Sequence, residues 1–207
     1  SKHFISDGEW SDFFLVSAKT GEKEISMFMV DKGLPGFTVG KDQKMMGIRG
    51  TPHLELFFDN VPLEDATLLG EAGQGFKVAM QTLDIFRTSV AAAALGFARR
   101  ALDEALSRAT KRKMFGQTLA DFQITQSKIA QMATGIDAAA LFTYRAAWLR
   151  DQGRSVTREA AMAKMTATET AQQVIDSAVQ IWGGLGVVSG HPVEKLYREI
   201  RALRIYE

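Results

Sequence analysis

The sequence contains no cysteine, which excludes disulfide bonds, thiolate metal ligands and thiol catalysis. It also lacks a long apolar run: residues 90–98 form the longest, far short of the roughly 20 residues that a membrane-spanning helix needs. Neither sign of charge is in excess, because the sequence has 25 basic and 24 acidic side chains. No overall field therefore draws the chain to nucleic acid or to an anionic membrane.

Proline is scarce and unevenly placed, and positions 63–191 contain none. That stretch is rich in Ala, Gln, Arg, Glu and Leu, which predicts helices. The first 66 residues instead contain short aromatic and β-branched runs separated by Gly, Pro and Asp, a pattern typical of strands. We therefore predict an α+β protein, with a small antiparallel β unit in residues 1–66 and an antiparallel four-helix bundle in residues 67–207.

The boundaries of the individual elements follow from the same patterns. Strands are predicted at residues 13–16, 25–30, 37–39 and 54–58, with a hairpin turn at residues 20–23. Helices are predicted at about residues 75–109, 119–150, 157–182 and 192 to the end of the chain. Gly153 is expected to end the second helix, and the core-facing stripe of that helix consists of Ile129, Met132, Ile136, Ala140 and Thr143.

Motifs for several kinds of site are missing. The three histidines, at positions 3, 53 and 191, show no metal-ligand spacing, so we expect no metal site. The glycine-rich segment 70–75 does not follow a buried parallel strand, and a turn that enters a helix explains it better than a phosphate loop. The leading residues do not have the pattern of a signal peptide.

Four features have both a chemical and a plain structural interpretation. Residues 111–117 (KRKMFGQ) suit a diphosphate or a stacked ring, although cations also complement the dipole of a helix end. Residues 180–186 (QIWGGLG) suit an anion or a simple helix cap. Asp84 and Arg87 have the spacing of an ordinary intrahelical ion pair, and a terminal Glu207 is usually solvated and inert.

Eight short segments, taken in chain order, resemble segments of one family of enzymes. They are KMMGIRGT at 44–51, FDNVP at 58–62 with LGEAGQGF at 69–76, RKMFG at 112–116 with DFQ at 121–123, QIWGGLG at 180–186, PVEKLYR at 192–198 and RIYE at 204–207. Together they resemble the acyl-CoA dehydrogenase family of flavoenzymes. The resemblance implies the end of the family's middle β domain followed by most of its C-terminal helical domain.

The resemblance also implies a chemistry. A glutamate removes a proton from Cα of an acyl-CoA thioester, a hydride leaves Cβ for N5 of FAD, and a trans-2-enoyl-CoA results. The implied partners are an acyl-CoA substrate, an electron-transferring flavoprotein that reoxidises FAD, and a second copy of the chain in a homodimer or homotetramer. Neither a nucleic acid nor a membrane span is implied, and a cytoplasmic location is favoured over the mitochondrial matrix.

The family's base position matches Glu207. Some members place the glutamate elsewhere, at a position that matches Phe86 here, and a phenylalanine cannot take a proton. Asp84 and Arg87 match positions that contact the substrate, and Phe86 is expected to limit the shape of its acyl group. Glu207 is therefore the expected catalytic residue.

The resemblance places FAD against two parts of the chain. Phe4, Ile5 and Ser6 match the strand that packs on the flavin ring, with the Ser6 hydroxyl near N5. The matches to the adenine and diphosphate contacts, made across a dimer interface, are Arg112, Phe115, Gln123, Gln180, Ile181, Trp182, Gly183 and Gly184. Met114 stands where a hydroxyl residue is common, so this position offers no hydroxyl for a hydrogen bond to the cofactor.

Family members are about twice this length, so we expect the chain to be a fragment that lacks the N-terminal helical domain. The isolated 207 residues are expected to have no dehydrogenase activity. Two alternatives stay open. One is a non-catalytic, oligomerising bundle that has kept the fold without FAD; the other is a related flavoprotein such as a nitroalkane oxidase or a flavin monooxygenase.

Overall fold

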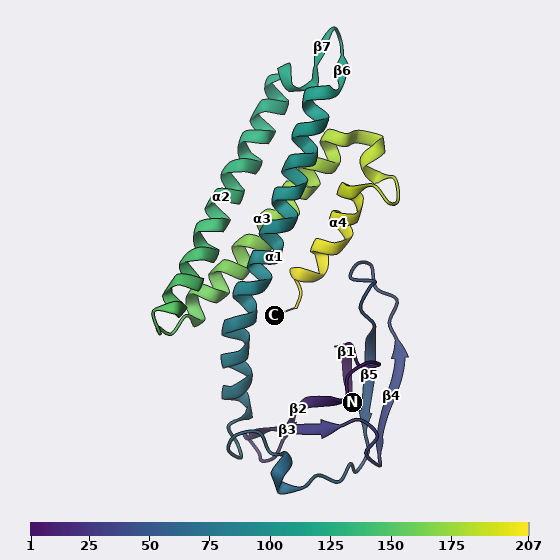
Figure 1. Cartoon of the computed structure of the whole chain (residues 1–207), viewed down its shortest axis with the longest axis vertical. Coiled ribbons are helices and arrows are strands. Elements are labelled where there is room, and N and C mark those ends of the chain that lie inside the picture. The colour runs from purple at the N-terminus through teal and green to yellow at the C-terminus, as the bar shows by residue number, and fades with distance from the viewer. Residues whose placement is uncertain (207) are drawn as a thin grey trace. The chain divides into compact units, whose positions relative to one another are not determined.

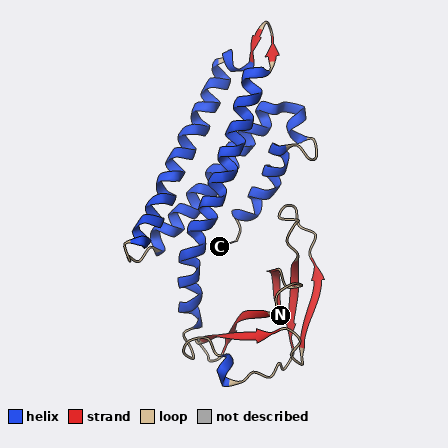
Figure 2. Cartoon of the chain, in the orientation of Figure 1, coloured by secondary structure: helices blue, strands red, loops and turns tan. Residues whose placement is uncertain are grey.

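The computed structural model describes residues 1–206, which form two compact units. Unit 1 ends at Thr82 and contains the larger β-strands, whereas unit 2 begins at Leu83 and contains long helices (Figures 1 and 2). Small antiparallel sheets followed by four helices agree with the predicted fold class. Among the described residues, no helix is long and apolar enough to cross a membrane.

Unit 1 contains two antiparallel sheets. The strands β1 (Lys2–Ser6), β5 (His53–Phe58) and β4 (Phe37–Asp42) form the first sheet, in that order. The strands β2 (Phe13–Lys19) and β3 (Ile25–Asp31) form a hairpin in regular register, from Phe13 opposite Asp31 to Lys19 opposite Ile25. The predicted turn closes this hairpin, because the Thr20 N–H donates to the Glu24 carbonyl over 3.0 Å.

The core of unit 1 joins its two sheets. Phe14 of β2, Phe37 of β4 and Leu56 of β5 form one buried cluster. The ring centroids of Phe14 and Phe37 are 5.2 Å apart, a tilted pair that adds a favourable aromatic contact to the burial of apolar area. A short 3₁₀ helix, η1 (Asp65–Thr67), follows the sheets and leads to the first long helix.

Four helices make up most of the rest of the chain. They are α1 (Gly75–Lys111), α2 (Gln123–Asp151), α3 (Thr157–Trp182) and α4 (Pro192–Leu203). A two-stranded hairpin, β6 (Lys113–Met114) with β7 (Gln117–Thr118), joins α1 to the 3₁₀ helix η2 (Leu119–Asp121). A further 3₁₀ helix, η3 (Gly183–Val187), follows α3.

Alanine dominates the buried faces of these helices. In α1 the residues Ala91, Ala94, Ala98, Ala101, Ala105 and Ala109 are almost fully buried, and α3 buries a similar series. Small side chains allow helix axes to approach closely, while larger residues such as Ile175 and Ile200 fill the remaining space. The predicted stripe on α2 is buried at Met132, Ile136, Ala140 and Thr143, with Ile129 half-buried.

Two predicted helix ends were wrong. The second helix begins at Gln123 rather than near residue 119, because Asp121 accepts hydrogen bonds from the main-chain N–H and the hydroxyl of Thr118 and caps a 3₁₀ turn there. The fourth helix ends at Leu203 instead of continuing to the terminus, and Arg204 is its C-cap. Gly153 does close α2, with φ of +72° and a following hydrogen bond from the Arg154 N–H to the Leu149 carbonyl.

Candidate functional site: two strained aromatic residues and a capped glycine turn

The first predicted cofactor segment, Phe4 to Ser6, contains a β-bulge. Lys2 pairs with Leu56 and Ile5 with Leu54, so β1 has one more residue than β5 over this interval. Phe4 occupies the bulge with φ of +58° and a side chain that is 65% exposed. Positive φ is an outlier for a bulky residue, and bulges often re-aim side chains beside functional sites. The strand therefore presents the Phe4 ring outward at a cost in backbone strain.

A second strained phenylalanine lies at the tip of the β6–β7 hairpin. Phe115 and Gly116 have φ of +49° and +81°, and Met114 pairs with Gln117, so these two residues form the central positions of a type I′ turn. Asparagine or glycine usually occupies the first of these positions. The Phe115 side chain is nonetheless 87% exposed. The hairpin therefore holds an aromatic ring in solvent against its conformational preference.

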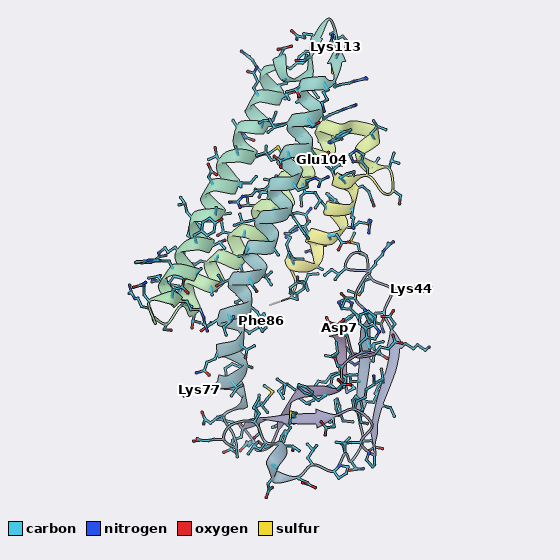
Figure 3. All side chains as sticks on the ribbon, in the orientation of Figure 1. Asp7, Lys44, Lys77, Phe86, Glu104 and Lys113 are labelled. Carbon is cyan, nitrogen blue, oxygen red and sulfur yellow. The ribbon has the colours of Figure 1, made fainter. Side chains whose placement is uncertain are left out.

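Cations surround the base of this hairpin. Arg112 follows α1 directly, with its N–H donating to the Arg108 carbonyl, and its own carbonyl accepts from the Leu119 N–H over 2.8 Å. Lys113 lies on the hairpin (Figure 3). Gln123 is exposed at the first position of α2. An exposed ring, guanidinium and amide at one end of the bundle suit a ligand that combines an aromatic base with phosphates.

The predicted segment from Gln180 to Gly184 ends α3 with a glycine turn. Gly183 has φ of +65° and ψ of −139°, a conformation that only glycine adopts readily. A Cβ added at Gly183 or Gly184 would meet no atom within 4 Å, so open space adjoins this part of the main chain. Gln180 is exposed, and Ile181 is half-buried. The turn therefore leaves its backbone accessible to a ligand.

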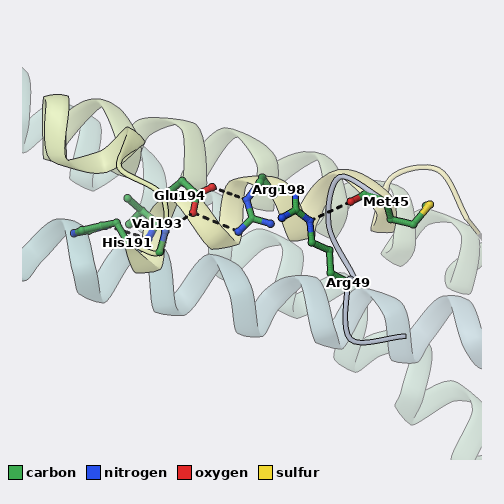
Figure 4. Close-up of polar contacts among 7 residues, drawn as sticks. Met45, Arg49, His191, Val193, Glu194 and Arg198 are labelled. Atoms are coloured by element: carbon green, nitrogen blue, oxygen red, sulfur yellow. Dashed lines mark hydrogen bonds and ion pairs between the residues drawn. The ribbon is translucent and has the colours of Figure 1, made fainter. Parts of the chain in front are cut away.

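Trp182 takes part in a contact network that the sequence did not predict. Its indole N–H donates to the Glu104 carbonyl of α1, the Arg108 guanidinium lies 5.1 Å from its ring centroid, and the His191 ring meets it edge-on at 4.3 Å. His191 also accepts a hydrogen bond from the Val193 N–H at the start of α4 (Figure 4). Trp182 thus joins three helices, and its N–H already has an acceptor.

The three predicted substrate residues lie within one turn of α1, near the start of unit 2. Asp84 Oδ2 accepts a hydrogen bond from the Thr157 hydroxyl over 2.6 Å, which ties α1 to the first residue of α3. Its other oxygen, Oδ1, is buried and has no hydrogen-bond partner among the described residues. Phe86 lies on α1 with its side chain 48% exposed (Figure 3), and Arg87 is half-buried.

The tail that leads to the predicted base is described up to Tyr206. Arg204 donates from Nε and Nη2 to the two carboxylate oxygens of Glu169 over 2.8 and 2.6 Å. The N–H groups of Ile205 and Tyr206 both donate to the Ala202 carbonyl. Glu207 lies outside the described residues. The predicted role of Glu207 is therefore not tested by this structure.

Among the described residues, both units have a cavity. A cavity of about 720 Å³ in unit 1 is lined by the loop between β4 and β5, residues Asp42, Gln43, Lys44, Met45, Met46, Arg49 and Thr51. In this loop the Arg49 Nε donates to the Met45 carbonyl over 3.1 Å (Figure 4). Residues 1–206 contain no group of three or more His, Asp and Glu side chains that is placed to hold a metal ion.

The cavity in unit 2 has a volume of about 360 Å³ and lies between α3, η3 and α4. Its wall includes an ion pair within α4, where Arg198 Nε donates to Glu194 Oε1 over 2.5 Å (Figure 4). This hydrogen bond raises the pKa of Arg198. Because Arg198 is paired with Glu194, the charge of its guanidinium is balanced within the cavity wall.

The family of the chain follows from comparison with known domains. The family model of the acyl-CoA dehydrogenase middle domain matches residues 1–61. The family model of the acyl-CoA dehydrogenase C-terminal domain matches residues 73–207. The chain belongs to the acyl-CoA dehydrogenase family.

Relatives in the acyl-CoA dehydrogenase family match along the whole chain. A 3-(aryl)acrylate reductase from Clostridium sporogenes is 42% identical over 210 residues, which cover 100% of this chain and 56% of the relative. The Caffeyl-CoA reductase-Etf complex subunit CarC from Acetobacterium woodii is 40% identical and is covered to 55%. The structure of butyryl-CoA dehydrogenase from Megasphaera elsdenii superposes with a TM-score of 0.95 at 40% identity, covering 99% of this chain and 55% of the other.

The comparisons confirm the family and the fold class that the sequence motifs predicted. The chain spans about half the length of the curated acyl-CoA dehydrogenase relatives that it matches, as expected for part of such a protein. The division near residue 66 and the roles of individual residues stay predictions.

Proposed function

We propose that this chain is part of an FAD-dependent acyl-CoA dehydrogenase. The enzyme would remove a proton from Cα and a hydride from Cβ of an acyl-CoA thioester, and so form a trans-2-enoyl-CoA. The observation that carries the proposal is the pair of exposed phenyl rings, Phe4 and Phe115, which the backbone holds at positive φ. Both had been matched to FAD contacts from the sequence, and strain of this kind collects at ligand sites.

The residues present fit FAD. Phe115 would stack on the adenine ring and Arg112 would pair with the diphosphate, since guanidinium binds phosphate through parallel hydrogen bonds. The open main chain at Gly183 and Gly184 suits a close approach of the same diphosphate. Phe4 would pack on the flavin ring. When bound, FAD supplies the hydride acceptor.

The chain's own residues would handle the proton and the substrate. The Glu207 carboxylate would accept the Cα proton, and such a base works best in a desolvated site that raises its pKa towards neutrality. Phe86 would set the shape of the acyl pocket. Arg87 would lie beside the pantetheine part of CoA. Because Asp84 already accepts a hydrogen bond from Thr157, its contribution would be to fix the wall of the site.

An electron-transferring flavoprotein is the proposed redox partner. One relative is named as a subunit of a complex with Etf, which supports this proposal. Two relatives are named as reductases and another as a butyryl-CoA dehydrogenase, so the assay should follow both desaturation and reduction of the Cα–Cβ bond.

FAD binding is the first property to test. The visible absorbance of the purified protein reports bound flavin, and titration with FAD gives its dissociation constant. Arg112→Met should weaken binding about 10- to 150-fold, since a charge-assisted hydrogen bond contributes about 1.5–3 kcal/mol. Arg150→Met is the matched control, because Arg150 is also an exposed arginine at a helix end but lies at the far end of α2. Equal affinities in the two variants would contradict the proposed diphosphate contact.

A second candidate function is that of an oligomerising bundle without FAD. One surface favours association: Leu141, Tyr144 and Trp148 lie at helical spacing on α2, and all three are exposed. We propose that this stripe contributes to a homodimer or homotetramer. Light scattering with Leu141→Ser and Trp148→Ser tests the stripe, and a protein that assembles but never binds FAD would support the second candidate over the first.

A further inference from the structure

Arg108, near the end of α1, differs from the other half-buried arginines of unit 2 whose contacts are described. Arg198 and Arg204 each pair with a glutamate, at N···O distances of 2.5 and 2.6 Å. Within residues 1–206, Arg108 takes part in no ion pair and its side chain in no hydrogen bond, although its Nε is buried. A charge that is partly removed from water without a partner costs free energy, so this guanidinium is suited to an anion from outside the chain.

The glutamate best placed to neutralise Arg108 is already paired. Glu104 lies four residues before Arg108 on α1 (Figure 3), in the order that favours an intrahelical ion pair. Glu104 instead accepts a hydrogen bond from Arg100, with a distance of 2.9 Å between Nε and Oε1. Between positions 105 and 120 the sequence has four basic residues and no acidic one. The end of α1 and the hairpin after it therefore carry an excess of positive charge.

Trp182 gives the Arg108 guanidinium a fixed platform. The guanidinium carbon lies over the indole ring, 5.1 Å from its centroid. The indole N–H donates to the Glu104 carbonyl over 3.2 Å, and the His191 ring meets the indole edge-on at 4.3 Å. A guanidinium that stacks on an aromatic face keeps its N–H donors in its own plane, where they can bind phosphate oxygens. The platform therefore orients Arg108 before any ligand arrives.

The main chain directly after Trp182 is also open to a ligand. Gly183 has φ of +65°, and a Cβ added at Gly183 or Gly184 would meet no atom within 4 Å. Exposed main-chain N–H groups in glycine turns bind anions. The residue that carries the cation is thus joined through one indole ring to a second anion-binding feature.

We propose that Arg108, held against Trp182, binds a diphosphate group, at a position that none of the sequence motifs marks. A diphosphate carries several negative charges, so it matches the excess of positive charge better than a single carboxylate does. Guanidinium also binds phosphate oxygens through parallel hydrogen bonds. The source of the group rests on the proposed function: FAD and coenzyme A both contain an adenosine diphosphate group, and the experiment separates them.

The test compares the wild type with Arg108→Met and Arg99→Met, each in the protein as expressed from its gene. Methionine keeps an unbranched side chain that packs well on an aromatic ring but carries no charge. Arg99→Met is the matched control, because it removes the same charge from the same helix. About two and a half turns separate Arg99 from Arg108, and Arg99 donates to the Tyr144 hydroxyl of α2 over 3.4 Å.

Dissociation constants for ADP, FAD and coenzyme A are measured by calorimetric titration. The indole N–H resonance of Trp182 in the ¹⁵N-labelled wild type is followed during the ADP titration. ADP should shift this resonance saturably, because its diphosphate binds the cation that lies on the ring. Arg108→Met should weaken ADP binding about 10- to 150-fold, as loss of a charge-assisted hydrogen bond predicts, and Arg99→Met should change it less than about twofold.

Two results would overturn the diphosphate site. One is equal ADP affinity in Arg108→Met and the wild type, and a purely structural role of Arg108 would combine this result with a lower Tm of the ligand-free variant. The other is a Trp182 resonance that ADP does not move, which decides the question in the wild type even where Arg108→Met fails to fold.

The FAD and coenzyme A titrations identify the source of the group. Weaker FAD binding in Arg108→Met with unchanged coenzyme A binding assigns the diphosphate to FAD, and the reverse assigns it to coenzyme A. A wild type that binds ADP through Arg108 but does not bind FAD would overturn the proposed function and leave the diphosphate site standing. FAD binding that is the same in all three proteins, with no effect of ADP on Trp182, would overturn the site and leave the proposed function standing.

Discussion

Replacing Phe115 by asparagine should stabilise the protein and weaken FAD binding. At φ of +49° a residue with an ordinary side chain costs about 1–2 kcal/mol, whereas Asn-Gly is the preferred pair for this type I′ turn. The ring is 87% exposed, so its removal gives up little buried apolar area. The free energy of unfolding should rise by about 1 kcal/mol, which corresponds to an increase of about 2–4 °C in Tm.

The same substitution removes the ring proposed to stack on adenine. Stacking of a base on an aromatic side chain contributes about 1–3 kcal/mol, so the dissociation constant for FAD should increase about 5- to 150-fold. Thermal unfolding of the flavin-free protein gives the first quantity, and titration followed by flavin fluorescence gives the second. The expected result is that the variant unfolds at a higher temperature than the wild type and yet binds FAD more weakly.

Phe13→Asn is the matched control for this experiment. Phe13 is also an exposed phenylalanine, but it lies on β2, where asparagine has a lower strand propensity. It should lower stability slightly and leave FAD binding unchanged. The reasoning about strain is refuted if Phe115→Asn is less stable than the wild type, and the reasoning about stacking is refuted if its FAD affinity is unaltered.

Three further substitutions test the packing and electrostatics of the helices. Gly186→Ala places a Cβ 2.6 Å from a main-chain oxygen and should lower the free energy of unfolding by about 1–3 kcal/mol in chemical denaturation. Thr157→Val removes the donor to Asp84 and should cost about 1–3 kcal/mol by the same assay, and an unchanged midpoint would show that this hydrogen bond is unimportant. The hydrogen bond from Arg158 lowers the pKa of Glu159, so its contribution to stability is present above the ordinary glutamate range near 4.5 and is lost as the pH falls through the lowered value. Glu159→Gln should therefore flatten the acid limb of a plot of Tm against pH, and a limb identical to that of the wild type would contradict this assignment.

Local patterns in the sequence predicted most of the secondary structure. The absence of proline between positions 63 and 191, together with the helix-favouring composition of that stretch, predicted the long helices. Gly153 predicted the end of α2, and α3 has the predicted bounds of Thr157 and Trp182. The end of α4 was missed because it coincides with the Arg204–Glu169 pair, which joins residues 35 positions apart. No periodicity encodes such a contact.

The candidate site was predicted by motif, but its physical basis was not. The amino-acid sequence around Phe4 and Phe115 does not indicate that either residue has a positive φ. The φ of Phe4 depends on a β-bulge, and the φ of Phe115 depends on the register of a hairpin with a two-residue loop. The Trp182 contacts to Glu104 and Arg108 likewise join distant turns of different helices. Only the arrangement of the elements in space could show that Trp182 packs against its neighbours.

The most direct test of the proposed activity is the turnover of Glu207→Gln. Acyl-CoA oxidation is followed with an artificial electron acceptor in the protein as expressed from its gene, using wild type and variant matched for flavin absorbance. Removal of a general base should lower kcat about 10²- to 10⁴-fold while FAD and the acyl-CoA still bind. A variant that desaturates the thioester at the wild-type rate would contradict the assignment of Glu207 and the mechanism built on it.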